Sequence, residues 1–220
     1  MRPSSLDSLL LREPPSHAPS IERALAAARQ ELALKQPVRR WRTQAVWVFS
    51  SSVAVVGLVA AVLLAQKQLT WEVLLRRSPL FALLWLTAAV CAWSALSPRG
   101  RWLRLVGSMM AVASAATLVF TRGESSVPPS VPAWVCTVSH LAVGIGPLIV
   151  SVIALRAAVF RPARALIAGL AVGTSGALVG ELACAQDWRH VAGYHLTAWA
   201  LIALVEVVVS RFLKPRSFAP

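Results

Sequence analysis

The sequence predicts an all-α membrane protein, in which six transmembrane helices form one polytopic helix bundle. Apolar residues make up 57% of the 220 residues and charged residues only 14%, whereas soluble domains carry about 25% charge. Strand-like alternation is absent, and backbone groups in lipid must bond within the protein, which favours helices. Six apolar runs approach the ~20 residues that cross a bilayer, at 44–65, 79–97, 103–121, 132–155, 163–184 and 192–212.

The distribution of basic residues predicts the orientation of the bundle. The formal net charge is +13, from 22 Lys and Arg against 9 Asp and Glu. With the N-terminus in the cytoplasm, 17 of the basic residues lie on that side, and the other side keeps Lys67, Arg76, Arg77, Arg122 and Arg189. The positive-inside rule therefore places both termini in the cytoplasm. The basicity then reflects topology, and we expect no direct contact with nucleic acid.

Three segments follow from this reading: a cytoplasmic tail at 1–43, the bundle at 44–213 and a cytoplasmic C-terminal tail at 214–220. The first tail has two amphipathic pieces separated by the Pro-rich break "REPPSHAP", which stops a helix. Apolar side chains recur there at helical spacing, namely Leu6, Leu9, Leu10, Ile21, Leu25 and Leu32. Such stripes lie on lipid, pack on their own bundle or dock into a partner's groove.

A line of small residues follows the fifth apolar run. Gly169, Gly173, Gly176 and Gly180 recur at i, i+4, i+7 and i+11, and Cys184 continues the line. Small residues let the backbones of membrane helices approach closely. The pattern predicts that this face is a packed interface and that Cys184 points into the bundle.

Polar side chains of three runs are expected to meet near the non-cytoplasmic ends of these runs. The fourth run starts at that level, the fifth ends there and the sixth starts there again. The six side chains of this predicted layer are Cys136, His140, Glu181, Cys184, His190 and His195. Glu206 lies deeper in the sixth run, where we expect it to pair with Ser210 or a neighbouring Arg and lock the bundle; a proton relay is the alternative. Carboxylates inside a membrane are costly, which makes them functional candidates.

Four interpretations of this layer remain open. The side chains cap helix ends, or two thiolates and imidazoles hold copper(I) or zinc. Alternatively, two histidines on different helices hold a haem. In the fourth interpretation the layer is a reversible sensor, in which Cys136 and Cys184 form a disulfide or capture a metal transiently and so shift helix packing. No metal ligand set is certain from these spacings.

Four stretches of the chain carry a resemblance to a known family. They are "CTVSHLAVGIGP" (136–147), "LRAAVFRP" (155–162), "AGLAVG" (168–173) and "GELACAQDWRHVAGYH" (180–195). With the short N-terminal tail and six spans, they resemble the six-span integral-membrane anti-sigma factors of the NrsF type. The likeness is greatest in spans four to six. The tail lacks the HxxxCxxC zinc motif of soluble anti-sigma domains, so sigma binding would fall to its apolar stripes.

The resemblance implies a negative regulator of transcription in the bacterial inner membrane. Its N-terminal region would hold an extracytoplasmic-function (ECF) sigma factor, and a stress signal would release it, with a protease as a further expected partner. Light acting through singlet oxygen, an oxidant or a metal is the expected signal, and carotenoid synthesis genes are the expected targets. In related members a cysteine pair at the positions of Cys136 and Cys184 takes part in sensing.

Two other function classes are alternatives to this one. A small six-span transporter or channel subunit would explain Glu181 and Glu206, but inverted halves and paired broken helices are not apparent. A haem oxidoreductase would use the histidines. The chain has no GxSxG, HExxH or Gly-rich phosphate loop, so we expect no enzyme activity.

Overall fold

A computed structural model describes residues 18–34, 40–98, 100–122, 132–156 and 160–213. Within these ranges the regular elements are helices and none is a strand, so the all-α prediction is confirmed. The chain divides into two units, Met1–Arg39 and Arg40–Pro220. The first helix of the second unit begins at Arg40, four residues before the apolar run at 44.

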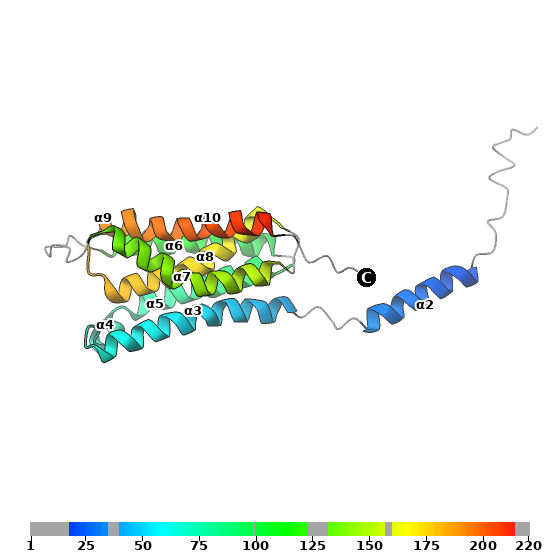
Figure 1. The fold of residues 1–220 in the computed structure, drawn as a ribbon, viewed down its shortest axis with the longest axis horizontal. Coiled ribbons are helices and arrows are strands. Elements are labelled where there is room, and N and C mark those ends of the chain that lie inside the picture. The colour runs from blue at the N-terminus through cyan, green and yellow to red at the C-terminus, as the bar shows by residue number, and fades with distance from the viewer. Residues whose placement is uncertain (1–17, 35–39, 99, 123–131, 157–159, 214–220) are drawn as a thin grey trace, which may run out of the picture. The chain divides into compact units, whose positions relative to one another are not determined.

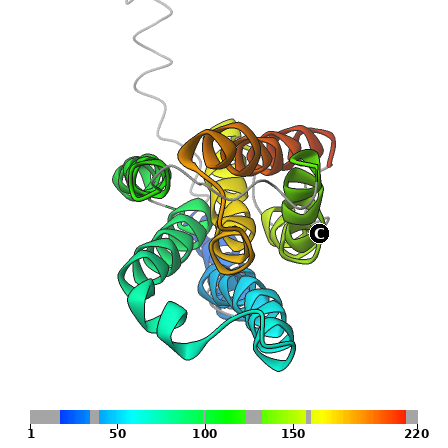
Figure 2. The same ribbon diagram turned by 90° about the vertical axis from the view of Figure 1, so that its left-hand side faces the viewer.

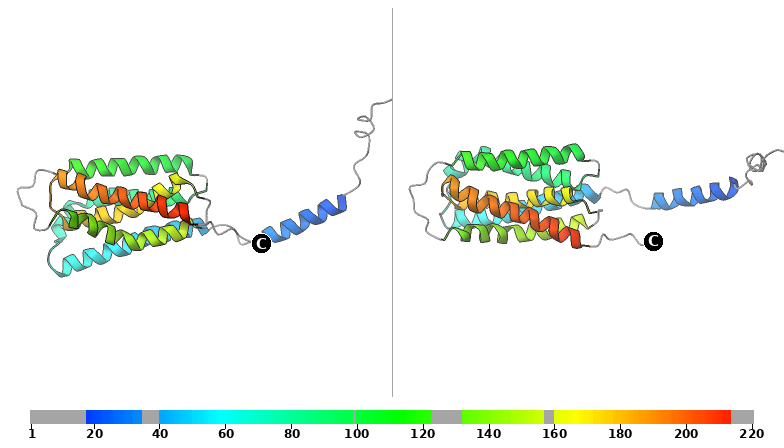
Figure 3. Two further views of the ribbon diagram at one scale, coloured as in Figure 1. Left: turned by 45° about the horizontal axis from the view of Figure 1, so that its top comes forward. Right: turned by 90° about the horizontal axis from the view of Figure 1, so that it is seen from above.

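The described residues of the second unit include six helical segments that are long and apolar enough to cross a membrane (Figures 1 and 3). They are α3 (Arg40–Ala65), α5 (Ser78–Leu96), α6 (Arg101–Phe120), α7 (Trp134–Leu155), α8 (Pro162–Ala183) and Trp188–Phe212, which joins α9 (Trp188–His190), η1 (Val191–His195) and α10 (Leu196–Phe212). The short α4 (Trp71–Arg76) connects α3 to α5. The start of α3 and the end of α10 lie at the same end of the bundle (Figure 1), and the cytoplasmic location of that end stays a prediction.

Helix α8 lies at the centre of the bundle, with α3, α5, α7 and α10 around it (Figure 2). Of its most apolar stretch 89% is buried, against 17% for α3 and 22% for α6. A central helix must be approached from all sides, which explains why its sequence is rich in Gly and Ala.

The four predicted packing glycines of α8 lie close to other helices. Gly169 faces Ala203, Gly173 faces Trp199, Gly176 faces His140, and Gly180 faces both His140 and His195. A methyl group at Gly173 would collide with the indole of Trp199. That ring has little freedom to move away, because its Nε1 donates a hydrogen bond to the Leu170 carbonyl at 2.8 Å.

The first unit contains α2 (Ala18–Leu34). Ile21 and Leu25 of the predicted stripe are both exposed on it, at 58% and 50%. The side chain of Leu32 and the residues Leu6, Leu9 and Leu10 lie outside the described part of the chain. The two described side chains of the stripe are therefore apolar surface at the helical spacing of a docking face.

Candidate functional site

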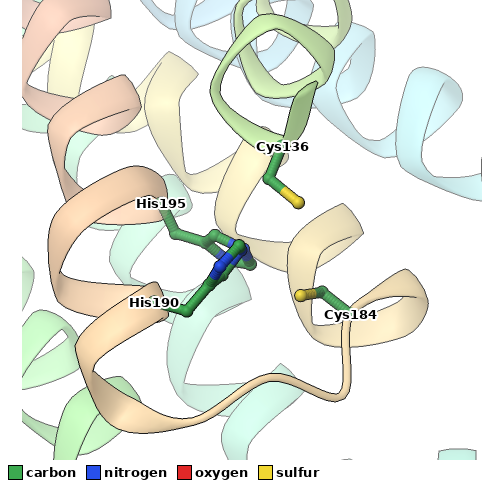
Figure 4. A group of neighbouring side chains, drawn as sticks. All are labelled: Cys136, Cys184, His190 and His195. Atoms are coloured by element: carbon green, nitrogen blue, oxygen red, sulfur yellow. The ribbon is translucent and has the colours of Figure 1, made fainter. Parts of the chain in front are cut away.

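Four side chains from three segments converge at the end of the bundle where α7 begins and α8 ends (Figure 4). We call them the thiol and imidazole cluster: Cys136, Cys184, His190 and His195. Each side chain offers one possible ligand atom, a thiol sulfur or a ring nitrogen, and the four atoms all lie within 4.8 Å of one another. The two thiols point toward each other, and the two imidazoles lie beside them (Figure 4).

A π-helical turn places both histidines of the cluster on one side of the sixth span. Residues five apart in an α-helix lie about 140° apart around the axis. Helix η1 has instead the i to i+5 hydrogen bonds of a π-helix, which align such residues. The rings of His190 and His195 are in edge contact, with centroids 5.2 Å apart. Residue periodicity gave no sign of this turn, and the i, i+5 spacing of the two histidines was the one available signal.

His140, also predicted for this layer, lies next to the cluster. Its Nδ1 is 2.7 Å from the carbonyl oxygen of Cys136. Its ring contacts that of His195 at a tilt of 50°, with centroids 4.4 Å apart. Gly176 and Gly180 leave the room on α8 that these rings occupy. His140 therefore contacts two members of the cluster and fixes where they lie.

Glu181, the sixth residue of the predicted layer, faces other partners. Its carboxylate oxygens accept from Arg77 at 2.9 Å and from Arg122 at 2.6 Å. Arg122 also donates to the Cys184 carbonyl at 2.8 Å, so it touches the cluster through the backbone. In the sequence, both arginines indicated only the orientation of the bundle and not an ion pair with Glu181. The signal that identifies them is a buried carboxylate near the few basic residues of that side.

The imidazoles of this region are buried, and their hydrogen bonding is incomplete. His140, His190 and His195 are 3%, 9% and 2% exposed. In each of the three rings Nε2 is buried without a hydrogen-bond partner among the described residues. Cys136 and Cys184 are free thiols and half-buried. Polar atoms seldom stay buried and unpaired, because each costs about 1–3 kcal/mol.

The geometry bears on two of the four interpretations, helix capping and haem binding. The short helix α9 is capped by Asp187, whose Oδ1 accepts from the backbone nitrogen of His190 at 2.9 Å. The N-terminus of α9 is therefore capped without any of the thiols or imidazole rings. A porphyrin between His140 and His195 would have to separate rings that are already in contact. Thiol chemistry and metal binding both remain compatible with these positions.

No family model and no solved structure matches the chain. A match to a curated protein decides the family: 58% identity over 218 residues to "Carotenogenesis protein CarR" of Myxococcus xanthus, covering 99% of each chain. The chain belongs to the CarR family. Because the match spans nearly the whole chain, it includes the N-terminal tail as well as the six spans of this CarR-family protein. The resemblance seen in the sequence is confirmed.

This member of the CarR family has a second buried carboxylate, Glu206 of α10. It is fully buried against Gly169 of α8. Its Oε1 accepts from the Ser151 hydroxyl of α7 at 3.1 Å, and its Oε2 is buried without a partner among the described residues. The expected partner Ser210 does not bond to it, since the Ser210 hydroxyl is also buried and unpartnered.

Proposed function

We propose that the protein is an integral-membrane anti-sigma factor of the bacterial inner membrane, which binds an ECF sigma factor and so represses carotenoid synthesis genes. The observation that carries the proposal is the match to a protein named for carotenogenesis, over 99% of both chains. A shared tail and a shared bundle support a shared mode of action. Six apolar helices support the membrane location.

Helix α2 is the expected site of sigma binding. Its exposed Ile21 and Leu25 are apolar side chains on a unit separate from the bundle. Burying each against a partner would contribute roughly 1.5–3 kcal/mol. Leu6, Leu9, Leu10 and Leu32 complete the predicted binding stripe. Binding there would keep the sigma factor from DNA without contact between this chain and nucleic acid.

A full-length binding experiment tests this part of the proposal. The detergent-purified chain is expected to retain the sigma factor encoded beside its gene, and Leu25→Asp is expected to release it, because a carboxylate replaces a buried anchor. Ala27→Asp is the matched control, since it lies two residues along the same helix and about 200° around it. No retention by the unaltered chain would refute sigma binding, and equal loss with both variants would refute the stripe.

The thiols Cys136 and Cys184 are the expected point of signal entry. Light acting through singlet oxygen, an oxidant or a metal would change their bonding, and a shift of α7 against α8 or cleavage by a protease would end sigma binding. Their half-buried position supports access by small reactants.

A reporter experiment tests signal entry through these thiols. With a sigma-dependent reporter, Cys136→Ser with Cys184→Ser is expected to change induction by light, oxidant or metal. Cys91→Ser is the control, because Cys91 is buried between α5 and α6, with its thiol 3.3 Å from the Gly107 carbonyl. Induction of the double variant at the level of the Cys91→Ser control would remove these thiols from signalling.

A further inference from the structure

We propose that the thiol and imidazole cluster is a closed four-ligand zinc site, with Cys136, Cys184, His190 and His195 as the ligands. The inference goes beyond the proposed function, because it assigns a resident ion and adds two histidines to the cysteine pair. It concerns the bundle alone, so the binding of a sigma factor is not needed for it to hold.

The first argument is the set of buried nitrogens without partners. His190 and His195 each carry an Nε2 that is buried and unbonded among the described residues, and the rings are 9% and 2% exposed. These two ring nitrogens lie beside two free thiols and have no partner among the described residues. A bound cation supplies the missing partner, whereas an apolar contact would leave the cost of burial uncompensated.

The second argument is distance. In a tetrahedral site with zinc–sulfur bonds of about 2.3 Å and zinc–nitrogen bonds of about 2.0 Å, ligand atoms are roughly 3.3–3.8 Å apart. The four ligand atoms here lie within 4.8 Å of one another. A movement of about 1 Å closes the difference, which is within the reach of a cysteine side-chain rotation. Cys136 and Cys184 are half-buried, so an ion has a way in.

The third argument is the local backbone conformation, which brings the ligands together. The π-turn η1 aligns His190 with His195, and π-turns inside α-helices are frequent at functional sites. Gly180 gives the His195 ring its place, since a methyl group there would lie 2.5 Å from its Nδ1. A side chain at Gly180 would push the ring out of the cluster.

Charge also favours a divalent ion. Two thiolates and two neutral imidazoles neutralise Zn²⁺, which suits a buried position. The guanidinium of Arg122 donates to the Cys184 carbonyl at 2.8 Å, which fixes the backbone that carries this ligand. The mixed sulfur and nitrogen set excludes calcium and magnesium, which take oxygen ligands.

His140 is a positioning residue in this site. Its Nδ1 contacts the Cys136 carbonyl at 2.7 Å and its ring packs on His195. Groups that orient metal ligands typically contribute 10- to 100-fold to metal affinity. The ligands come from α7, from the end of α8 and from the start of the sixth span, so the ion would join three spans of the bundle.

Metal content of the purified full-length chain tests the proposal. The protein is prepared in detergent with a tag that lacks histidine, and its zinc is measured by mass spectrometry after dialysis. We expect about one zinc ion per chain, as one tetrahedral site requires. Cys136→Ser, Cys184→Ser, His190→Ala and His195→Ala should each lose it. Cys91→Ser should keep it, and His140→Ala should bind with affinity lowered about 10- to 100-fold.

A second measurement uses the unaltered chain, in case a variant does not fold. Cobalt(II) is titrated into the metal-free protein, and the absorption should show tetrahedral cobalt with thiolate-to-cobalt charge transfer. Bound zinc should protect Cys136 and Cys184 from alkylation. Absence of the thiolate band, zinc that survives the cysteine substitutions, or binding that needs the cysteines but neither histidine would each overturn the four-ligand site. Sigma binding is measured separately, so either proposal can fail alone.

Discussion

Two buried carboxylates lie at different levels of α8, Glu181 on α8 itself and Glu206 on the neighbouring α10, and they differ in their hydrogen-bond and ion-pair partners. Glu181 is 2% exposed and bonds to two arginines, Arg77 and Arg122. Glu206 is 0% exposed and has one hydrogen bond, from Ser151. It packs on Gly169, about 18 Å along α8 from Glu181 by the helical rise. The Glu181 end therefore holds a charged network, whereas the Glu206 end holds a single polar contact.

The difference shows which end of the bundle depends on charge. At the Glu181 end the carboxylate connects α8 to Arg77 beside α5 and to Arg122 after α6. Loss of the carboxylate therefore leaves two guanidinium groups without an ion-pair partner. At the Glu206 end no cation bonds to the carboxylate among the described residues. Substitutions that remove charge should therefore destabilise the two ends to different degrees. A packing substitution at Gly173, between the two levels of α8, is expected to have an intermediate effect.

The largest effect is expected for Glu181→Ala. The change leaves two guanidinium groups without their anion, one of them on a side chain only 7% exposed. Breaking a buried ion pair on one side costs about 3–5 kcal/mol. Thermal unfolding of the detergent-solubilised chain, followed by circular dichroism, measures the loss. Glu72→Ala in α4 is the control, because Glu72 is exposed; equal shifts for both variants would show that the arginine pairs contribute little.

A smaller effect is expected for Gly173→Ala in the middle of α8. The new methyl group would collide with Trp199, whose indole is fixed by its bond to the Leu170 carbonyl. Overpacking of this kind costs about 1–3 kcal/mol. Gly57→Ala in α3 is the control, since a methyl group there meets no atom within 4 Å. A stable Gly173→Ala variant would mean that α8 and α10 separate easily.

The spans themselves were predictable from the sequence because a bilayer demands about 20 apolar residues. The described ends fall within four residues of the predicted ones, for example Trp134–Leu155 for the run at 132–155. The glycine line also predicted that one face of α8 is a packed interface, because small residues let helix backbones approach closely. Both signals are local, so they survive without knowledge of the neighbouring helices.

The partners of Glu181 were not predictable in the same way. Its bonds to Arg77 and Arg122 join residues 104 and 59 positions apart, and no local pattern specifies which spans are neighbours. The π-turn at Val191–His195 was missed for a related reason. One extra residue in a turn rotates all that follows by about 100°, yet it leaves the apolar composition unchanged. The candidate site therefore depended on structure for its geometry and on sequence only for its residue types.

The smallest effect is expected for Glu206→Gln. The amide oxygen can accept the Ser151 hydrogen bond as the carboxylate does, and no bonded cation loses its counterion among the described residues. A near-isosteric change that keeps the hydrogen bond should cost below about 1 kcal/mol. Glu181→Gln is the matched comparison in the same unfolding assay, because the identical change there removes the charge that Arg77 and Arg122 need. Equal losses at the two positions would show that shape, and not charge, distinguishes the two ends of α8. A loss confined to Glu181 would mean that the network beside Cys184 is the electrostatic anchor of the bundle.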